Sequence, residues 1–260
     1  MPSVGPLLSE FRKRSRLSQL QLSLMADVSS RHISFIETGR SSPSREMLLR
    51  LADVLGLPHK DCNLLLNSAG YAAAYSELDI DSDEMSPIRD ALEMVLRNHE
   101  PYPALVMDGC YNLLMGNHAQ QALMASLTHG LLEPPTTNLV EALFRDDMFR
   151  PVVANWSDVA GHMLRRLRKQ VLAYSNPAHR ELYNTLLGLQ PPDGWQQPRD
   201  GQGDGPMLTL ELRRGPITLS VFTTISQFGT ALDTGVEELL IESYFPANEE
   251  TRQFFRTLVQ

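Results

Sequence analysis

The hydrophobic positions of residues 6–70 recur at helical spacing, in short runs that begin at a capping residue and end at a helix-breaking one. A hydroxyl at Ser18, Ser29 or Ser44 can accept a hydrogen bond from a free amide of the first helical turn. Gly39 and Gly56 supply the left-handed position that commonly follows a last turn. The pattern predicts a compact all-α domain of five short helices. They cover about residues 6–15, 18–27, 29–39, 44–56 and 58–70.

From Ile88 onward, short strand-like runs alternate with helical ones. Two apolar runs on either side of Gly109-Cys110 predict a hairpin, and three more strands are expected near the C-terminus. The five strands cover about residues 103–108, 111–117, 207–213, 217–224 and 238–246. Helices are expected over residues 88–98, 119–127, 139–144, 157–174 and 178–189, and from Asn248. Residues 191–206, rich in Pro, Gly, Asp and Gln, predict a mobile loop. The order predicts an α+β domain with an antiparallel sheet, which resembles the PAS-like arrangement of sensor domains.

The charge of the chain divides it into two parts. The net charge of −8 argues at first against nucleic acid as a partner. Residues 1–75, however, hold nine basic and six acidic side chains, a net +3, and the remainder holds 14 basic and 25 acidic groups, a net −11. Such asymmetry indicates two tasks in one chain. We therefore expect a first domain over residues 1–74, an acidic solvated linker over 75–87 and a second domain over 88–260.

Several classes of protein are disfavoured by the sequence. No apolar run approaches the ~20 residues that a membrane span needs, and the N-terminal segment lacks the apolar core of a signal peptide. The two cysteines, Cys62 and Cys110, give no disulfide framework and indicate a reducing cytoplasm. The chain has no Gly-rich phosphate loop and no nucleophile elbow, and its seven histidines lack metal-ligand spacing. We expect no catalytic residue, cofactor or metal.

The second and third predicted helices form a helix-turn-helix candidate, in which the second helix enters the major groove of DNA. Ile33 and Ile36 take the inward face of that helix, so its outward face carries polar and aromatic side chains. These are Ser30, Arg31, Ser34 and Phe35. Arg31 can donate two hydrogen bonds to guanine, and Phe35 can pack on a thymine methyl group.

The segment Leu17-Ser18-Gln19, Val28-Ser29 and Ile33 to Arg40, closed by Glu37-Thr38-Gly39-Arg40, resembles the XRE family of phage-repressor-like regulators. The resemblance implies that Gln19 contacts a phosphate and braces the recognition helix, although an exposed polar role stays open. It also implies a structural ion pair between Arg12 and Glu37. Thr38 and Arg40 suit phosphate contacts, and His32 either touches the backbone or fills the rim. The predicted DNA-contacting residues are Gln19, Ser29, Ser30, Arg31, His32, Ser34, Phe35, Thr38 and Arg40.

The second domain carries candidate residues for an apolar ligand pocket, each of which can also be plain core. They are Met107, Leu114, Met115, Phe144, Phe149, Trp156, Met163, Leu167, Leu219 and Phe222. Arg168, or its neighbours Arg165 and Arg166, can anchor a ligand carboxylate. The runs Ala69-Gly70-Tyr71, Pro103 to Asp108, Asn112-Leu113-Leu114 with Asn117, and Asn155-Trp156 resemble the MmyB-like group of XRE regulators. That resemblance implies a PAS-like domain with a fatty-acid-like ligand, and the sequence departs from it after Thr224.

These observations favour a transcription regulator in which a small apolar ligand of the second domain modulates DNA binding by the first. A single small module reads few base pairs, so we expect a homodimer on a palindromic operator of double-stranded DNA. Two alternatives remain open. One is a constitutive regulator whose second domain serves only dimerisation or protein interaction, and the other is an adaptor that uses its helix-turn-helix for packing.

Overall fold

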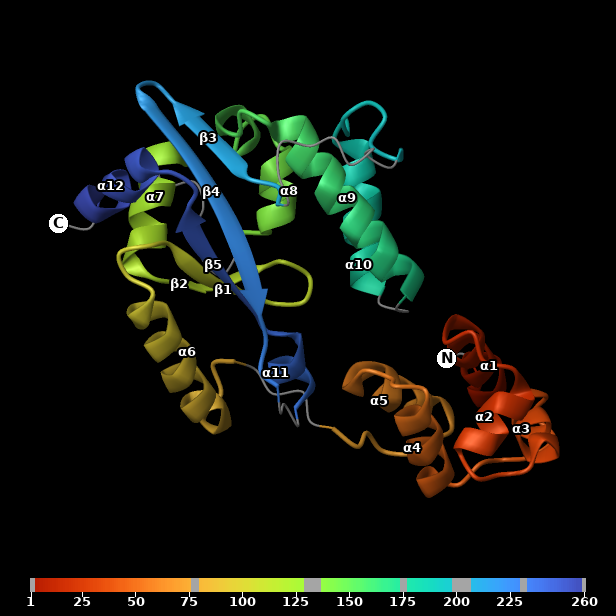
Figure 1. The fold of residues 1–260 in the computed structure, drawn as a ribbon. Helices are drawn as coiled ribbons and strands as arrows, with labels where there is room; N and C mark the ends of the chain where they lie inside the picture. The colour runs from red at the N-terminus through yellow and green to blue at the C-terminus, as the bar shows by residue number, and fades with distance from the viewer. Residues whose placement is uncertain are drawn as a thin grey trace. The chain divides into compact units, whose positions relative to one another are not determined.

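The computed structural model describes residues 3–75, 80–128, 137–173, 177–197, 207–229 and 233–258. The chain forms two compact units (Figure 1). The first unit comprises Met1–Leu78 and Thr230–Glu237, and the second comprises Asp79–Gly229 and Glu238–Gln260. The first division falls inside the predicted linker, while a short segment from late in the chain joins the first unit.

The first unit contains the five helices expected from the hydrophobic pattern. They are α1 (Val4–Arg14), α2 (Gln19–Met25), α3 (Ser30–Glu37), α4 (Arg45–Val54) and α5 (His59–Ser68). Ser18 forms a capping box with Gln21, and Ser29 and Ser44 accept hydrogen bonds from first-turn amides of α3 and α4. All five helices contribute to one core, with Leu8, Leu22, Ile33, Leu51 and Leu65 fully buried. The predicted all-α domain is confirmed.

A glycine sets how closely α1 approaches the end of α3. A Cβ atom at Gly5 would lie 2.6 Å from the carbonyl oxygens of both Ile36 and Glu37. That distance is too short for any side chain, so the contact needs glycine. The close approach fixes the end of α3 against the N-terminal helix.

A short helix from late in the chain, α11 (Thr234–Glu238), begins in the first unit. The Glu237 Oε2 atom accepts a hydrogen bond from the His59 amide, at 2.9 Å, and lies 3.3 Å from His59 Nδ1. The N-cap residue of α5 is Pro58, which makes no side-chain capping bond. Glu237 therefore supplies an N-terminal partner that the sequence next to α5 lacks.

The second unit is built on a five-stranded antiparallel sheet with the order β2-β1-β5-β4-β3. The strands are β1 (Ala104–Met107), β2 (Leu113–Gly116), β3 (Leu210–Arg214), β4 (Ile217–Ser226) and β5 (Leu240–Pro246). The helices are η1 (Asp83–Met85), α6 (Ser86–Asn98), α7 (His118–Thr128), α8 (Leu139–Phe144), η2 (Arg150–Val152), α9 (Trp156–Ala173), α10 (Pro177–Gly188) and α12 (Glu249–Leu258). The predicted α+β domain with an antiparallel sheet is confirmed.

The two faces of this sheet carry separate cores. On one face, α6 packs Leu92 and Leu96 against Val106 and Ile241. The other face packs against α7, α8, α9, α10 and α12, in a core that includes Leu105 and other strand residues. Because successive side chains of a strand point to opposite faces, neighbouring strand residues belong to different cores.

Two segments differ from the loops predicted for them. In the described part of the predicted linker, Met85 is buried and Ile80 packs on the core, although the acidic side chains beside them stay exposed. Trp195, inside the predicted mobile loop, is buried against the Tyr183 ring, and its carbonyl accepts a hydrogen bond from Arg165 at 2.9 Å. Apolar anchors therefore hold both segments. Residues 198–206 of that loop lie outside the described residues, as do residues 230–232 in the region after Thr224 where the sequence departs from the MmyB-like pattern.

Within the described ranges, no helix combines the length and the apolar character needed to cross a membrane.

The buried Asn117 side chain joins three parts of the second unit. Its Oδ1 atom accepts hydrogen bonds from the amides of Ala104 and Gln120, at 3.0 and 2.9 Å. Its Nδ2 group donates to the carbonyls of Leu96 and Tyr102, at 3.2 and 2.8 Å. The end of α6, the start of β1 and the first turn of α7 are therefore held by one amide.

We predict that Asn117→Ala lowers the free energy of unfolding of the second unit by about 2–4 kcal/mol, because buried backbone groups lose their partners. Urea unfolding followed by tryptophan fluorescence measures this unit, since it holds Trp156 and Trp195, the only tryptophans of the chain. Asn98→Ala, at an exposed position of α6, is the control. Equal midpoints for the two variants would contradict the prediction.

Candidate functional site

The C-terminal end of α3 is held by a buried ion pair. Arg12 of α1 donates from Nε and Nη2 to the two carboxylate oxygens of Glu37, at 2.6 and 2.8 Å. Gln19 of α2 donates to Glu37 Oε2 at 2.8 Å, and Arg12 also donates to the Leu17 carbonyl. One carboxylate thus links three helices and fixes the orientation of α3. The predicted Arg12–Glu37 pair is present, and the Gln19 amide braces the helix.

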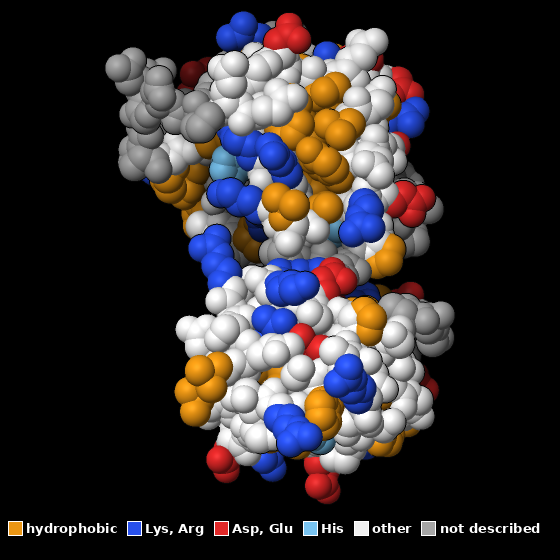
Figure 2. Space-filling view, turned by 90° about the vertical axis from the view of Figure 1, so that its right-hand side faces the viewer, with side chains coloured by type: hydrophobic (Ala, Val, Ile, Leu, Met, Phe, Trp, Pro, Cys, Tyr) orange, Lys and Arg blue, Asp and Glu red, His pale blue; other side chains and the backbone are white. Residues whose placement is uncertain are grey.

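The outward face of α3 is free of structural contacts with the core. Ile33 and Ile36 are fully buried, whereas Arg31 is exposed and Ser34 and Phe35 are partly exposed. Of the other predicted contact residues, Ser29, Ser30, Thr38 and Arg40 are exposed, and Gln19 and His32 are partly exposed. Apart from Gln19, which lies at the start of α2, the predicted set lies along α3, its cap and the turn after it. Figure 2 shows Lys and Arg side chains spread over the first unit on the face in view.

Phe35 lies between two arginines. The Arg31 guanidinium carbon is 5.1 Å from the centre of the Phe35 ring, and that of Arg40 is 6.0 Å away. Both distances are in the range of cation–π contacts. Thr38 bonds back to the Ser34 carbonyl at 2.7 Å. The Phe35 ring therefore helps to orient the Arg31 and Arg40 side chains. The sequence led us to expect only an apolar contact with a thymine methyl group for this residue.

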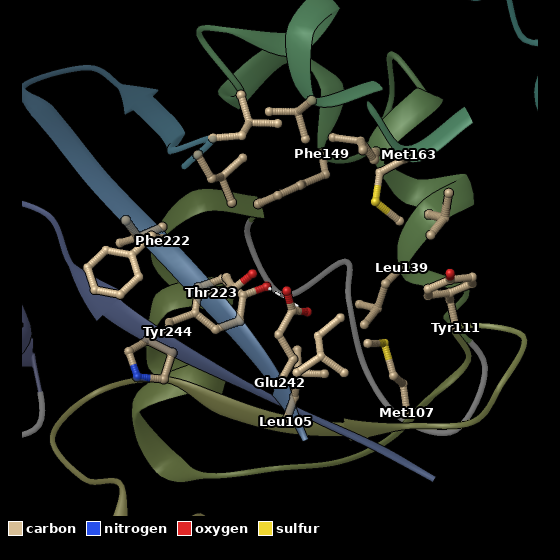
Figure 3. A pocket seen from close by; sticks show the side chains of 18 of the residues that line it. Leu105, Met107, Tyr111, Leu139, Phe149, Met163, Phe222, Thr223, Glu242 and Tyr244 are labelled. Carbon is tan, nitrogen blue, oxygen red and sulfur yellow. Dashed lines mark hydrogen bonds between the residues drawn. The ribbon is translucent and has the colours of Figure 1, made fainter. Parts of the chain in front are cut away.

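The second unit contains a cavity of about 550 Å³ between the sheet and the helices α7, α8 and α9. Its lining is largely apolar and includes Leu105, Met107, Leu139, Phe149 and Met163, which Figure 3 shows around the cavity. The volume lies in the range of ~300–1,000 Å³ typical of small-molecule sites. The arrangement can enclose an apolar molecule.

Some predicted pocket residues line this cavity and others do not. Those in the lining are Met107, Phe149, Met163, Phe222 and Arg166. Those outside the lining are Leu114, Met115, Phe144, Trp156, Leu167, Leu219, Arg165 and Arg168. The reasons are physical and differ from residue to residue.

Leu114 and Met115 pack on the α6 face of the sheet, beyond an irregularity in the β1–β2 pairing between Val106 and Met107. Leu167 and Leu219 are buried in the core behind the lining, as is Phe144. Trp156 is structural: its Nε1 donates to the Leu143 carbonyl at 2.8 Å, and the Arg150 guanidinium lies 3.8 Å from its ring centre. Arg168 is exposed on α9, one residue beyond Leu167 and two beyond Arg166, which faces the cavity.

Of the polar part of the lining, the sequence pointed only to Arg166 of α9, one of three candidate anchors for a carboxylate. The polar residues that it did not indicate include Glu242 and Tyr244 of β5, Thr223 of β4 and His162 of α9. Burial raises the pKa of Glu242 and, with the Glu242 charge, raises that of Tyr244 well above 10.0. Partial desolvation, with the nearby charges of Arg165 and Arg166, lowers the pKa of His162. Among the described lining residues, Arg166 is the only Lys or Arg.

A signal for these residues was present in the sequence. Glu242 and Tyr244 stand two residues apart in a predicted strand, which places both side chains on one face. A charged side chain in a strand usually lies on the solvent-exposed face of the sheet. Here α9 packs over that face, so Glu242 lines the cavity instead. Over the described ranges, no group of three or more His, Cys, Asp or Glu side chains is placed to hold a metal ion.

Comparison with known protein families gives two matches. Residues 88–258 match the family described as the MmyB-like transcription regulator ligand binding domain. Residues 8–61 match the family described as helix-turn-helix. The two matches fall on the second and the first unit.

Two individual proteins are similar to the chain. The uncharacterized HTH-type transcriptional regulator RghRB of Bacillus subtilis (strain 168) is 31% identical over 118 residues, which are 45% of this chain and 76% of that protein. A solved structure described as an RNA-binding light-oxygen-voltage receptor is 12% identical, with a TM-score of 0.25. The match covers 97% of this chain and 61% of that one, and at this TM-score it carries no argument.

We predict that Glu37→Ala lowers the free energy of unfolding of the first unit by about 3–5 kcal/mol, because it leaves the Arg12 charge buried without its partner. The Glu37 side chain is only 6% exposed and that of Arg12 10%. Unfolding by circular dichroism measures the change, and tryptophan fluorescence of the second unit should stay unaltered. Glu46→Ala, at an exposed position of α4, serves as the control.

The same pair has a pH signature. Burial acts to raise the pKa of Glu37, but hydrogen bonds from Arg12 and Gln19 outweigh it, so the pKa lies below the ordinary 4.5. The stabilisation is therefore complete above about pH 4.5 and is lost as the pH falls through the lower folded-state value. The isosteric Glu37→Gln variant should lose this part of the acid dependence. An unchanged acid profile would contradict the assignment.

Proposed function

Because the chain belongs to the family of helix-turn-helix transcription regulators with an MmyB-like ligand-binding domain, we propose that α3 reads DNA under the control of an apolar ligand. The observation that carries the proposal is the division of α3 into a fully buried inner face and an outer face that bears Arg31. A recognition helix needs that division, since the inner face fixes its position and the outer face contacts the bases.

Each part of the proposed interface has its own task. Arg31, oriented by Phe35, donates to a guanine edge, and Ser30 and Ser34 read neighbouring positions permissively. The exposed caps and turn, with Ser29, Thr38 and Arg40, contact phosphates and set the register. Gln19 keeps its bond to Glu37 and contacts a phosphate beside it. His32 lies at the rim of this surface.

We propose that the protein binds a palindromic operator as a homodimer. A single short recognition helix contacts only a few base pairs, so specificity requires two half-sites about one turn of DNA apart. Two-fold symmetry of the protein then matches the symmetry of the operator.

The proposed ligand is an apolar, fatty-acid-like molecule in the cavity of the second unit. The support is the apolar lining from Met107, Leu139, Phe149 and Met163, with Arg166 as the cation that pairs with an acidic head group. The ligand modulates DNA binding only if it binds two arrangements of the protein with different affinity. A fatty acid should therefore change operator affinity at constant protein concentration.

Selection and sequencing of genomic fragments bound by the purified full chain tests the proposal directly. A shared palindromic motif is the expected result. Fragments without any common motif would contradict DNA reading by α3.

We predict that Arg31→Ala weakens operator binding by about 1–3 kcal/mol and relaxes specificity at a single base pair of each half-site. The reason is the loss of two hydrogen bonds to one guanine. Competition binding with single-position operator variants measures the change. Arg97→Ala in α6 is the matched control, since that side chain is 77% exposed in the second unit. An equal loss of affinity at every operator position would indicate a phosphate contact instead.

We predict that Met163→Trp weakens stabilisation of the protein by a fatty-acid probe such as dodecanoate, because the larger side chain takes up part of the cavity. Operator binding without the probe should be unchanged. Thermal unfolding with and without dodecanoate measures the effect. Met94→Trp, on an α6 residue that is 62% exposed outside the cavity, is the control. A thermal shift retained in full in Met163→Trp would place the probe elsewhere.

A further inference from the structure

Three polar side chains form a cluster on the apolar face of the sheet. Glu242 and Tyr244 are two residues apart on β5, and Thr223 of β4 pairs with Tyr244 in the sheet register. The three therefore point to the same face, where the neighbouring strand residues Leu105 and Val221 are apolar. Figure 3 shows the Glu242 carboxyl beside Thr223 and Tyr244, within the cavity. We call Thr223, Glu242 and Tyr244 the polar cluster.

The carboxyl group of Glu242 has more hydrogen-bonding capacity than the polar cluster uses. Tyr244 donates its hydroxyl to Glu242 Oε2 at a long 3.5 Å, and the Thr223 side chain forms the second hydrogen bond. A carboxylate offers about four acceptor positions, and a polar group kept from water costs free energy when its positions stay empty. Burial raises the pKa of this carboxyl, as expected for an incompletely compensated group. A donor from a ligand would complete it.

The cation of the cavity, Arg166, lines the same space as this carboxyl. Arg166 acts electrostatically to lower the pKa of Glu242, against the larger effect of burial. Its guanidinium carbon lies 5.8 Å from the centre of the Tyr111 ring, and among the described residues it forms no hydrogen bond or ion pair. The lining of one cavity therefore holds both a carboxyl group that can accept further hydrogen bonds and a guanidinium group that can donate them.

Simple head groups satisfy only one of the two. A bare carboxylate pairs with Arg166 but brings like charge toward Glu242, whereas an alkyl amine pairs with Glu242 but meets the Arg166 charge. A head group that has an O–H or N–H next to a carboxylate or carbonyl oxygen satisfies both.

We infer that Glu242 determines ligand specificity, and that the ligand is an apolar chain whose head group places an O–H or N–H donor beside an acceptor oxygen. A hydroxylated fatty acid and an N-acylated amino acid have this chemistry. The inference rests on the proposed function, because it assumes that the cavity takes an apolar chain. The inference adds the chemistry of the ligand's head group to the proposed function, and it names Glu242 as the residue that recognises this head group.

A matched pair of probes isolates the donor. Tetradecanoate and its beta-hydroxy derivative share the chain and the carboxylate and differ by a single hydroxyl. Calorimetric titration of the full chain gives both dissociation constants. We expect the hydroxy acid to bind about tenfold or more tightly, because the unhydroxylated acid leaves Glu242 incompletely paired.

Three variants assign the preference to its residues. Glu242→Leu should abolish the tenfold ratio, and Glu242→Gln, which keeps an acceptor oxygen, should retain part of it. Arg166→Gln should weaken both probes by a similar factor and leave the ratio in place. A merely structural role of Glu242 would lower stability without changing the ratio. If Glu242→Leu does not fold, the ratios of the unaltered protein and of Glu242→Gln still decide.

Each remaining outcome overturns the inference in a distinguishable way. Equal binding of the two probes to the unaltered protein removes the role of Glu242 and leaves a fatty-acid sensor intact. A preference that survives in Glu242→Leu assigns the hydroxyl to another residue. Absence of binding by both probes removes the proposed ligand class, and with it this inference.

Discussion

The second unit depends on the two-residue period of β5. This strand lies in the middle of the sheet and is hydrogen-bonded to β1 on one side and to β4 on the other. Because β5 is paired on both sides, each of its side chains points to one face of the sheet or to the other. Ile241 fills the α6 core, while Glu242 and Tyr244 on either side of Ser243 reach the cavity. The register of one strand thus decides both the packing beneath α6 and the polarity of the cavity.

The first unit depends on a single carboxylate in a similar way. Glu37, at the end of α3, accepts hydrogen bonds from Arg12 of α1 and Gln19 of α2. Because Gly5 has no side chain, α1 can lie directly against the last carbonyl groups of α3. The position of α3 is fixed from within the unit. The contacts that position α3 come from Glu37 and from the inner face of the helix, whereas Arg31 on its outer face is exposed.

Much of the fold could be predicted from the sequence, because helix caps depend on residues that are close together along the chain. The hydroxyls of Ser18, Ser29 and Ser44 cap helices where their positions predict, and α8 has the predicted bounds. The cavity is less predictable, because it depends on which elements meet. Leu114 is displaced to the other face by an irregularity of the β1–β2 ladder. Trp195 is buried against Tyr183 of α10, a contact that follows from how the segment after α10 folds back onto that helix. Charge misleads at Glu242, since a strand pattern alone does not reveal that a helix covers that side.

The first unit includes residues of α11, a helix that lies between β4 and β5 of the second unit in the sequence. Glu237 caps α5 from a segment that enters the chain between β4 and β5, some 180 positions later. The first unit is therefore discontinuous in the gene, and a fragment that stops near residue 87 lacks one of its own pieces. Shuffling by recombination at a single junction would separate α5 from its partner. A cut at any single position of the chain therefore leaves at least one of the two units incomplete.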